Sequence, residues 1–173
     1  SSKGTKEKID QHSEDYMLIE KVYGENKEFP PFKWIDTREI TENHSQRKVL
    51  TFLLPVRSDL ASNCTILVNV KEEDVCRIFS ETDYISAATI YLVNNNNMII
   101  SAKDKALIGK AVAGIPKPSG KASSSSYVDD IHGERSLVTY MKSSYVDWTF
   151  YSVIPIKALM KDNVDALKNT FIL

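Results

Sequence analysis

The side chains that could carry out chemistry are few and widely separated in this sequence. His12, His44 and His132 are far apart, and no two of them have the i, i+4 spacing of a helical metal pair. Asp129 and Asp130 are adjacent, and neighbours on a strand point to opposite faces, so they cannot work as an acid–base pair. The sequence has no Gly-x-Ser-x-Gly motif and no glycine-rich phosphate loop. We therefore expect no catalytic residue, no metal site and no cofactor.

The aromatic residues are the more informative group, because most of them flank or lie in predicted strands. They are Tyr84, Tyr91, Tyr127, Tyr140, Tyr145, Trp148 and Tyr151. Core packing is one explanation for them. A ligand cavity is the other, because tyrosine supplies both an apolar wall and a hydroxyl group. In that second interpretation the cavity is lined by Tyr91, Tyr127, Asp129, Tyr140 and Tyr151.

Length and charge limit what these residues can belong to. The chain has 173 residues, of which 42% are hydrophobic and 26% are charged, which is typical of one folded domain or of one domain and a fragment. A chain of this length buries enough apolar surface to fold without a metal or a disulfide. The net charge of −1 argues against a nucleic-acid partner.

Cys64 and Cys76 are not expected to form a disulfide. Cys64 begins an apolar strand that ends near Val70, and a helix that folds straight back from there to Cys76 recovers only about 8 Å of the strand's length. The remaining gap exceeds the Cα separation of about 7 Å that a disulfide tolerates. We expect two buried thiols that are not linked.

The first part of the chain predicts one helix and the end of a small sheet. The helix has an apolar face at three-to-four spacing and ends at Gly24. Trp34–Ile40 is predicted to be a short extended piece, and residues 42–47 a polar turn. Val49–Val56 and Thr65–Val70 are predicted to form an antiparallel pair of strands.

A connecting helix is predicted to follow, over residues 71–85. Its first turn is acidic, which suits the positive end of the helix dipole. Val75, Ile78 and Phe79 give it one apolar face.

The second part of the chain predicts a five-stranded antiparallel sheet. Asn94–Asn97 is good hairpin-turn chemistry between two apolar runs, and a short helix is predicted over Asp104–Lys110. A loop rich in Gly, Pro and Ser over residues 113–126 precedes the last three strands. The predicted strands are Ala88–Val93, Met98–Ser101, Ser126–Ile131, Arg135–Lys142 and Trp148–Ile154.

The last predicted strand leads directly into a final helix. Pro155 ends this strand, and apolar residues from Ile156 to Phe171 form one stripe of the helix. The chain then ends on an apolar stretch, which fits either a helix whose last turn packs on the core or a helix that continues toward a membrane. The predicted fold class is α+β, with a PAS-like five-stranded antiparallel sheet, flanking helices and a long C-terminal exit helix.

Two segments of this sequence resemble the beginning and end of a Cache module. The beginning runs from Thr89–Val93 through the asparagine turn to Ile99–Ser101 and Leu107–Lys110, and the end is Trp148–Ile156 with Leu159. Cache modules are PAS-like extracytoplasmic sensors of bacterial transmembrane receptors. The resemblance covers about residues 65–165. Within the Cache family, the sequence is similar to the ectodomains of double-Cache sensor histidine kinases.

The resemblance implies a domain organisation and a set of partners. Residues 1–70 are the N-terminal helix and a remnant of the membrane-distal module, 71–85 the connecting helix, 86–156 the membrane-proximal module, and 157–173 an exit helix toward a transmembrane span. The ligand is an unknown small molecule or an extracellular binding protein, and the full receptor is a homodimer in the cell membrane. Signal output would pass through Pro155, Ile156 and Leu159.

One departure from the family affects the ligand. The amino-acid motif found in the family, an arginine two residues before an aromatic pair, is not matched, because Phe32-Lys33-Trp34 carries lysine and lacks the spacing. Three alternatives remain open: a protein-interaction module without a small-molecule pocket, the sensor domain of a membrane-anchored transcription regulator, and a cytosolic PAS-like domain or small enzyme.

Overall fold

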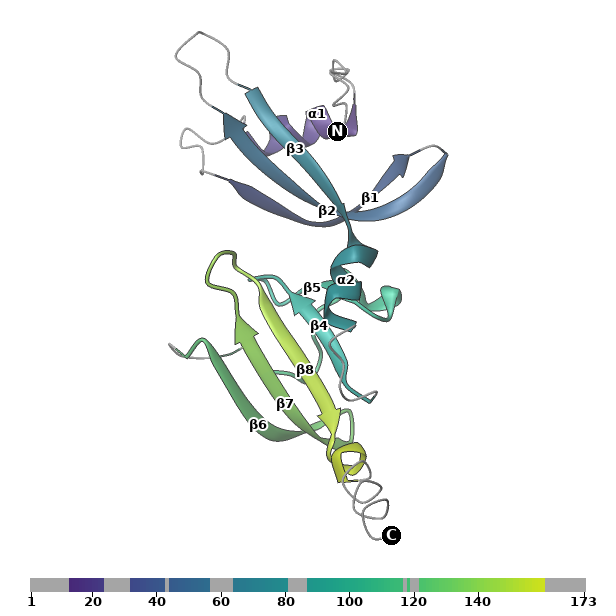
Figure 1. The fold of residues 1–173 in the computed structure, drawn as a ribbon, viewed down its shortest axis with the longest axis vertical. Helices are drawn as coiled ribbons and strands as arrows, with labels where there is room; N and C mark the ends of the chain where they lie inside the picture. The colour runs from purple at the N-terminus through teal and green to yellow at the C-terminus, as the bar shows by residue number, and fades with distance from the viewer. Residues whose placement is uncertain are drawn as a thin grey trace, which may run out of the picture.

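Two antiparallel sheets, joined by one helix, lie one above the other along the long axis of the molecule (Figure 1). The structure is a computed structural model that describes residues 13–23, 32–42, 44–56, 64–80, 87–116, 118 and 122–160. The N-terminal sheet has three strands in the order β1-β2-β3, and the C-terminal sheet has five in the order β5-β4-β8-β7-β6. The predicted α+β class and the five-stranded antiparallel sheet are confirmed.

The N-terminal sheet consists of β1 (Lys33–Glu42), β2 (Ser45–Val56) and β3 (Cys64–Lys71), each antiparallel to its neighbour. The predicted pairing of the second and third strands is confirmed. The polar turn predicted over 42–47 is wrong in extent, because β2 already begins at Ser45 and its partner is Glu42. His44 has a φ of 64°, so the chain reverses direction there within two residues.

Helix α1 (Glu14–Tyr23) covers one face of the N-terminal sheet. The Ser13 hydroxyl accepts a hydrogen bond from the Tyr16 N–H at 3.2 Å, and acidic residues fill the first turn, so the start of the helix is capped. Val22 and Tyr23 are buried against Leu53 of β2. The part of this helix predicted before residue 13 lies outside the described residues.

Helix α2 (Glu72–Ser80) follows β3 without an intervening loop and lies between the two sheets (Figure 1). The predicted acidic first turn is present as Glu72, Glu73 and Asp74. Val75 and Phe79 pack against the interior, but Ile78 is 64% exposed. Its place on the predicted apolar face is therefore wrong, because the sheets contact only a narrow stripe of this short helix.

The C-terminal sheet begins with a hairpin of β4 (Thr89–Val93) and β5 (Ile99–Ala102), which pair antiparallel across the asparagine turn. A short 3-10 helix, η1 (Lys105–Leu107), follows where an α-helix over Asp104–Lys110 is predicted. Its N-cap Asp104 accepts the Ala106 N–H at 2.9 Å.

The remaining three strands are β6 (Ser124–Ile131), β7 (Glu134–Lys142) and β8 (Thr149–Pro155). The predicted positions are confirmed to within two residues. Strand β8 lies in the middle of the sheet, with β4 on one side and β7 on the other. Pro155 is its last residue and has Ser136 as its partner.

Alternation along the strands gives the C-terminal sheet two different apolar faces. Leu92, Ile100 and Phe150 lie on one face and contact α2 and the N-terminal sheet. Tyr151 and Val153 lie on the other face, where residues of the segment between β5 and β6 cover them, as expected from the two-residue period of a strand.

The two sheets meet at an apolar contact. Leu50 of β2, which is fully buried, packs with Leu92 and Ile100 of the C-terminal hairpin. Trp34 of β1 contacts Trp148 across the same boundary, with ring centroids 5.1 Å apart. Burying a leucine-sized side chain stabilises a fold by about 1.5–3 kcal/mol, so this contact holds the sheets together.

A buried polar joint lies beside this apolar contact. Glu72, the first residue of α2, is 0% exposed; its Oε1 accepts the Ser101 hydroxyl of β5 at 2.6 Å, and its Oε2 is 2.7 Å from the Lys105 ammonium. Burial disfavours the charged form of Lys105, but Glu72 and, to a smaller extent, Cys76 together outweigh this effect and raise the pKa of Lys105. The joint fixes α2 on the C-terminal sheet at the point where the N-terminal sheet ends.

The C-terminal helix is described only at its start. Residues 156–160 are helical, and the rest of the predicted exit helix lies outside the described residues. Among the residues that the structure describes, no helix combines the length and apolar character needed to cross a membrane.

Cys64 and Cys76 are not joined by a disulfide, as predicted, but Cys64 is exposed and Cys76 half-buried, so the prediction of buried thiols is wrong. Their strand and helix present these positions to the surface.

The buried joint gives a stability prediction. Glu72→Gln keeps an acceptor for Ser101 but removes the charge that pairs with Lys105, so we expect the free energy of unfolding to fall by about 1–3 kcal/mol. Urea unfolding followed by circular dichroism measures it. Glu73→Gln, at the exposed neighbouring position, is the matched control and should change stability by at most about 0.5 kcal/mol. Equal effects of the two substitutions would contradict the role of the joint.

Candidate functional site

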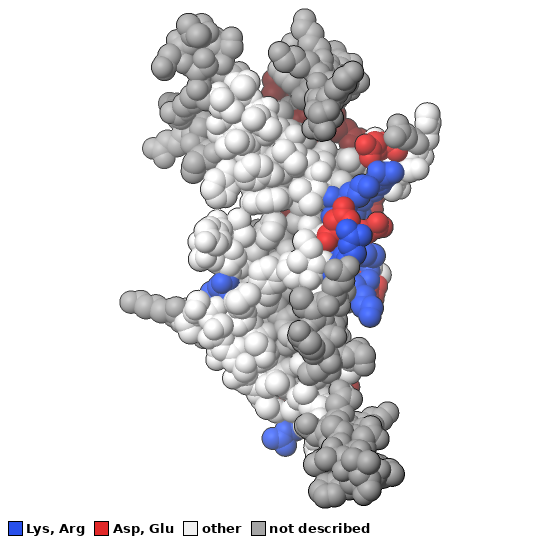
Figure 2. Space-filling model, viewed as in Figure 1, with Lys and Arg blue, Asp and Glu red and all other residues white. Residues whose placement is uncertain are grey.

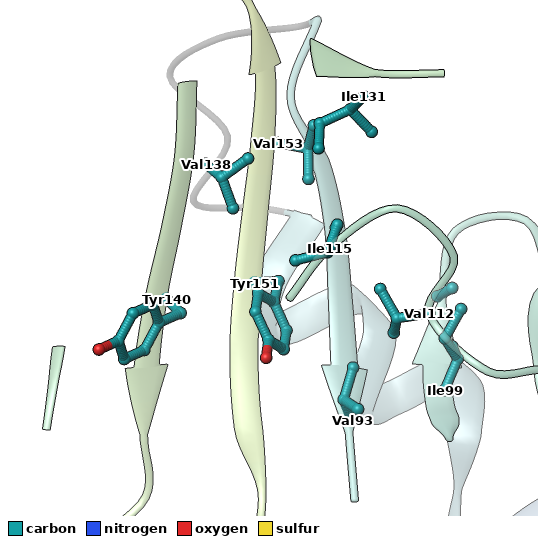
Figure 3. Packing of buried hydrophobic residues seen from close by; sticks show 10 residues of the cluster. Val93, Ile99, Val112, Ile115, Ile131, Val138, Tyr140, Tyr151 and Val153 are labelled. Carbon is teal, nitrogen blue, oxygen red and sulfur yellow. The ribbon is translucent and has the colours of Figure 1, made fainter. Parts of the chain in front are cut away.

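The predicted tyrosines belong to one apolar cluster of the C-terminal sheet, of which Figure 3 shows Tyr140 and Tyr151. Tyr140 and Tyr151 are buried partners on β7 and β8, with ring centroids 6.3 Å apart. Tyr91 and Tyr127 are partly buried against the same cluster. Asp129, the fifth predicted residue, is exposed on β6 and its Oδ1 accepts the Asp130 N–H at 2.8 Å.

Burial is the main cause of the raised pKa of Tyr91, Tyr127 and Tyr151. It raises the pKa of Tyr151 to about 12, with smaller contributions from Tyr127 and Tyr140. Burial also raises the pKa of Tyr127, whose hydroxyl oxygen has no hydrogen-bond partner among the described residues. The four tyrosines therefore form a mostly apolar layer of uncharged rings, and their role in ligand binding stays a prediction.

An open cleft lies where the two sheets meet. It has a volume of about 640 Å³, within the size range of small-molecule sites. One wall comes from β1 of the N-terminal sheet, a second from the asparagine turn between β4 and β5, and a third from the loop between β7 and β8. The lining residues are Phe32, Lys33, Trp34, Ile35, Asp36, Asn94, Asn95, Asn96, Ser143, Ser144, Tyr145, Val146, Asp147 and Trp148.

The asparagine turn is held in shape by one buried side chain. The Oδ1 atom of Asn94 accepts hydrogen bonds from the N–H groups of Asn96 and Met98, both at 2.9 Å. Asn97 has a φ of 63°, a conformation that asparagine tolerates better than most residues. The Nδ2 group of Asn94 donates to Oδ2 of Asp36 at 2.5 Å, so the turn is tied to the N-terminal sheet.

The loop between β7 and β8 has its own internal hydrogen bonds. The Ser143 hydroxyl accepts the N–H groups of Tyr145 and Val146, at 3.2 and 3.3 Å. The Ser143 N–H donates to the Trp148 carbonyl at 2.9 Å, which closes the loop at its base. This wall of the cleft is consequently ordered by its own short-range contacts.

Aromatic and acidic side chains dominate the cleft. Trp34 and Trp148 are half-buried and in contact, whereas Phe32 is 40% exposed and Tyr145 is 85% exposed. Asp36 and Asp147 are exposed carboxylates, and Lys33 is the only cationic side chain in the lining. Such a site can stack a ligand against rings and accept hydrogen bonds from it.

Sequence reasoning missed the cleft as a site. It predicted the asparagine turn and noted Tyr145 and Trp148 among the aromatic residues, but nothing in the sequence connects them to Asp36. The connection is made by a contact between Asp36 and Asn94, which are 58 positions apart. The periodicity of a sequence indicates only local structure. A single sequence therefore gives no indication that Asp36 contacts Asn94.

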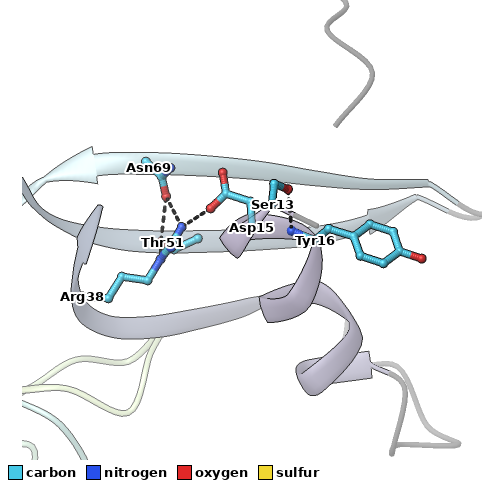
Figure 4. Close-up of polar contacts among 6 residues, drawn as sticks. All are labelled: Ser13, Asp15, Tyr16, Arg38, Thr51 and Asn69. Atoms are coloured by element: carbon cyan, nitrogen blue, oxygen red, sulfur yellow. Dashed lines mark hydrogen bonds and ion pairs between the residues drawn. The ribbon is translucent and has the colours of Figure 1, made fainter. Parts of the chain in front are cut away.

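A cluster of polar side chains lies under α1, on the N-terminal sheet (Figure 4). Arg38 donates from Nε to the Thr51 hydroxyl at 2.8 Å and from its terminal nitrogen to Asp15 and to Asn69. The Thr51 hydroxyl donates to Asn69 Oδ1 at 2.7 Å. Each charged group in this cluster has a partner, so the cluster anchors α1 to the sheet.

Charged side chains gather along one edge of the molecule, from the β1–β2 turn to α2 (Figure 2). They are largely arranged in pairs of opposite charge: Arg47 with Glu42 at 2.8 Å, Lys48 with Glu39 at 3.1 Å, and Arg77 with Asp74 at 2.8 Å. Such exposed pairs contribute little stability. Within the described ranges, no three His, Cys, Asp or Glu side chains come together as a metal site would require.

Comparison with known proteins identifies the fold. No family profile and no curated protein matches the sequence. Among solved structures, the ligand-binding domain of the Pseudomonas aeruginosa PAO1 chemoreceptor PctB with L-Gln is 18% identical, with a TM-score of 0.61, over 100% of this chain and 70% of that one. The Pseudomonas fluorescens chemoreceptor CtaA domain with L-isoleucine is 14% identical, with a TM-score of 0.57, over 77% of this chain and 56% of that one.

A third structure is the extracellular domain of rpHK1S-Z16, a protein assigned as a histidine kinase. It is 11% identical, with a TM-score of 0.60, over 81% of this chain and 59% of that one. This chain thus spans just over half of the CtaA and rpHK1S-Z16 domains. At these identities the likeness establishes the fold, which this chain shares with the ligand-binding and extracellular domains of these receptors, and the resemblance inferred from the sequence is confirmed at the level of the fold.

The raised pKa of Tyr151 predicts a loss of stability in alkali. Between pH 10 and about 12 the unfolded chain loses the Tyr151 proton while the folded chain keeps it, so stability falls as the pH rises. Tyr151→Phe should make the fall in the free energy of unfolding smaller, by on the order of 2 kcal/mol. Urea unfolding at several pH values measures this difference. Tyr145→Phe, at an exposed ring, should leave the pH dependence of the wild type unchanged. An identical pH dependence in Tyr151→Phe would show that this hydroxyl is not buried.

Proposed function

We propose that this chain is the extracytoplasmic ligand-sensing domain of a bacterial transmembrane receptor, with a two-component sensor histidine kinase as the leading candidate. The fold likeness to chemoreceptor and histidine-kinase domains supports a sensing role. In this proposal residues 1–70 belong to a membrane-distal module, 71–85 connect, 86–156 form the membrane-proximal module, and 157–173 lead toward the membrane. The domain itself has no catalytic role.

The observation that carries the proposal is that the walls of the cleft come from both sheets. A ligand that touches β1, the asparagine turn and the β7–β8 loop together binds best in one relative arrangement of the two sheets. Only this difference in affinity can shift a conformational equilibrium. A full switch from 1:99 to 99:1 requires a difference of about 5.5 kcal/mol.

The path from the cleft to the output runs along β8, from the cleft end of the C-terminal sheet to its opposite end. The hairpin that carries the asparagine turn pairs with β8 through β4, from Thr89 opposite Val153 to Val93 opposite Thr149. Strand β8 ends at Pro155, and the helix containing Ile156 and Leu159 begins at once. Proline fixes the backbone at this junction, so a shift of roughly 1–2 Å in the sheet would be passed to the helix.

The partner of the domain is proposed to be a small molecule, and the full receptor a homodimer anchored in the cell membrane. PctB and CtaA are bound to L-Gln and L-isoleucine in their structures, which supports a ligand of similar size. A protein-interaction module is the second candidate, because Ile66 and Val68 of β3 are exposed side by side on one face of their strand. The sensor domain of a membrane-anchored transcription regulator would use the same fold.

A ligand screen tests the sensing role. We expect one compound among amino acids, small carboxylates, sugars and amines to raise the melting temperature, because a ligand at 100 times its dissociation constant adds about 2.7 kcal/mol of stability. Two variants then show where the stabilising compound binds. Asp36→Asn should weaken binding in the cleft, whereas Tyr127→Phe should weaken it if the ligand lies among the tyrosines. A screen without any stabilising compound would favour the protein-interaction module.

Cross-linking tests the output role of the helix. In the full-length receptor, a disulfide between cysteines introduced at Ile156 of the two protomers should lock signalling in one state, because the helices could no longer move relative to each other. The measurement is receptor output with and without a reducing agent, in a background without Cys64 and Cys76. Unchanged output in the oxidised receptor would show that the signal does not pass through this helix.

A further inference from the structure

We infer that the cleft between the two sheets binds a small organic cation, either an amine or a quaternary ammonium compound. This inference rests on the proposed function, because it names the chemical class of the ligand that the sensor would detect. It is drawn from the rings, the carboxylates and the size of the cleft.

Aromatic rings supply the apolar walls. Trp34 comes from β1 and Trp148 from the end of the β7–β8 loop, and their contact places the two tryptophan rings next to each other in the lining. Tyr145 lines the same cleft and is 85% exposed, although a tyrosine in a folded domain usually packs its ring. Tryptophan and tyrosine faces attract cations through the ring quadrupole, most strongly when the cation is shielded from water.

Carboxylates supply the charge. Asp36 and Asp147 each contribute a negative charge to the lining and Lys33 one positive charge, so the formal charge of the lining is −1. The Asp36 carboxylate is held in place by the buried amide of Asn94, at 2.5 Å from its Oδ2 atom. A cleft lined by an oriented carboxylate and by aromatic rings is a site for a positive group, whereas an anion would meet two like charges there.

The size of the cleft restricts the ligand to a small one. A volume of about 640 Å³, open to solvent, accommodates an ammonium group with a short apolar or hydroxylated body. Asn95, Asn96 and the serines of the β7–β8 loop line the rest of the space and can bind hydroxyl groups of such a body. A neutral sugar could hydrogen-bond to these amides, hydroxyls and carboxylates, but it carries no positive charge to pair with the carboxylates.

The test compares a cation with a neutral molecule of the same shape. Choline and tetramethylammonium, as chloride salts, are titrated into the full chain and followed by calorimetry and by tryptophan fluorescence, next to the neutral isostere of choline in which carbon replaces nitrogen. We expect both cations to bind and the isostere to bind at least about tenfold more weakly, because it loses the ion pair and the cation–π attraction. Sodium chloride at the same ionic strength is the blank.

Three substitutions assign the binding to the cleft. Asp36→Asn should weaken choline binding by about tenfold and Tyr145→Ala by about threefold, because they remove a charge and an exposed ring. Glu134→Gln removes an exposed carboxylate at the β6–β7 turn, at the opposite end of the C-terminal sheet, and should leave binding unchanged. Circular dichroism shows whether each variant retains the fold.

Several results would overturn the inference. They are equal binding of choline and its neutral isostere, no binding of either cation, and loss of binding in Glu134→Gln but not in Asp36→Asn. A sugar or an anion that binds the cleft while cations do not would also overturn it, and the proposed sensing function would then stand with another ligand class. The absence of any small-molecule ligand in the broader screen would instead count against the sensing function itself.

Discussion

The packing of Leu50 against Leu92 and Ile100 is the contact on which the rest of this molecule depends. It joins a strand of the N-terminal sheet to the hairpin of the C-terminal sheet, and α2 closes it from the side through Val75 and Phe79. Apolar packing of this kind has no direction of its own, so it brings the sheets together without fixing their orientation. Because β1 and the asparagine turn are held close by this contact, a cleft forms beside it.

Directional polar contacts fix the orientation that the apolar contact leaves free. Three of them join the sheets or their connecting helix: Glu72 with Ser101, Asn94 with Asp36, and the Thr37 hydroxyl with the Ile100 carbonyl. Each involves the β4–β5 hairpin. The hairpin is therefore the element through which these polar contacts tie the N-terminal sheet and α2 to the C-terminal sheet, and it pairs with β8 through β4.

The C-terminal sheet separates two environments that the sequence could not tell apart. On one side Tyr140 and Tyr151 are packed into an apolar layer under Val112 and Ile115. On the other side Leu92 and Phe150 face α2 and the N-terminal sheet, next to the open cleft. The tyrosines are conspicuous in the sequence because of their number and their positions in strands. The residues that line the cleft form no motif that the sequence would reveal.

The sequence by itself determined the local structure: the connecting helix with its acidic first turn, the hairpin around Asn94–Asn97, the three closing strands and the order of these elements along the chain. These follow from periodicity, turn chemistry and helix capping, which act between near neighbours in the chain. Only the tertiary structure decided that Ile78 is exposed and that Asp36 meets Asn94 in a cleft lined by Trp34 and Trp148. These features depend on contacts between residues distant in sequence, and such contacts form only when two sheets with matching apolar faces pack against each other.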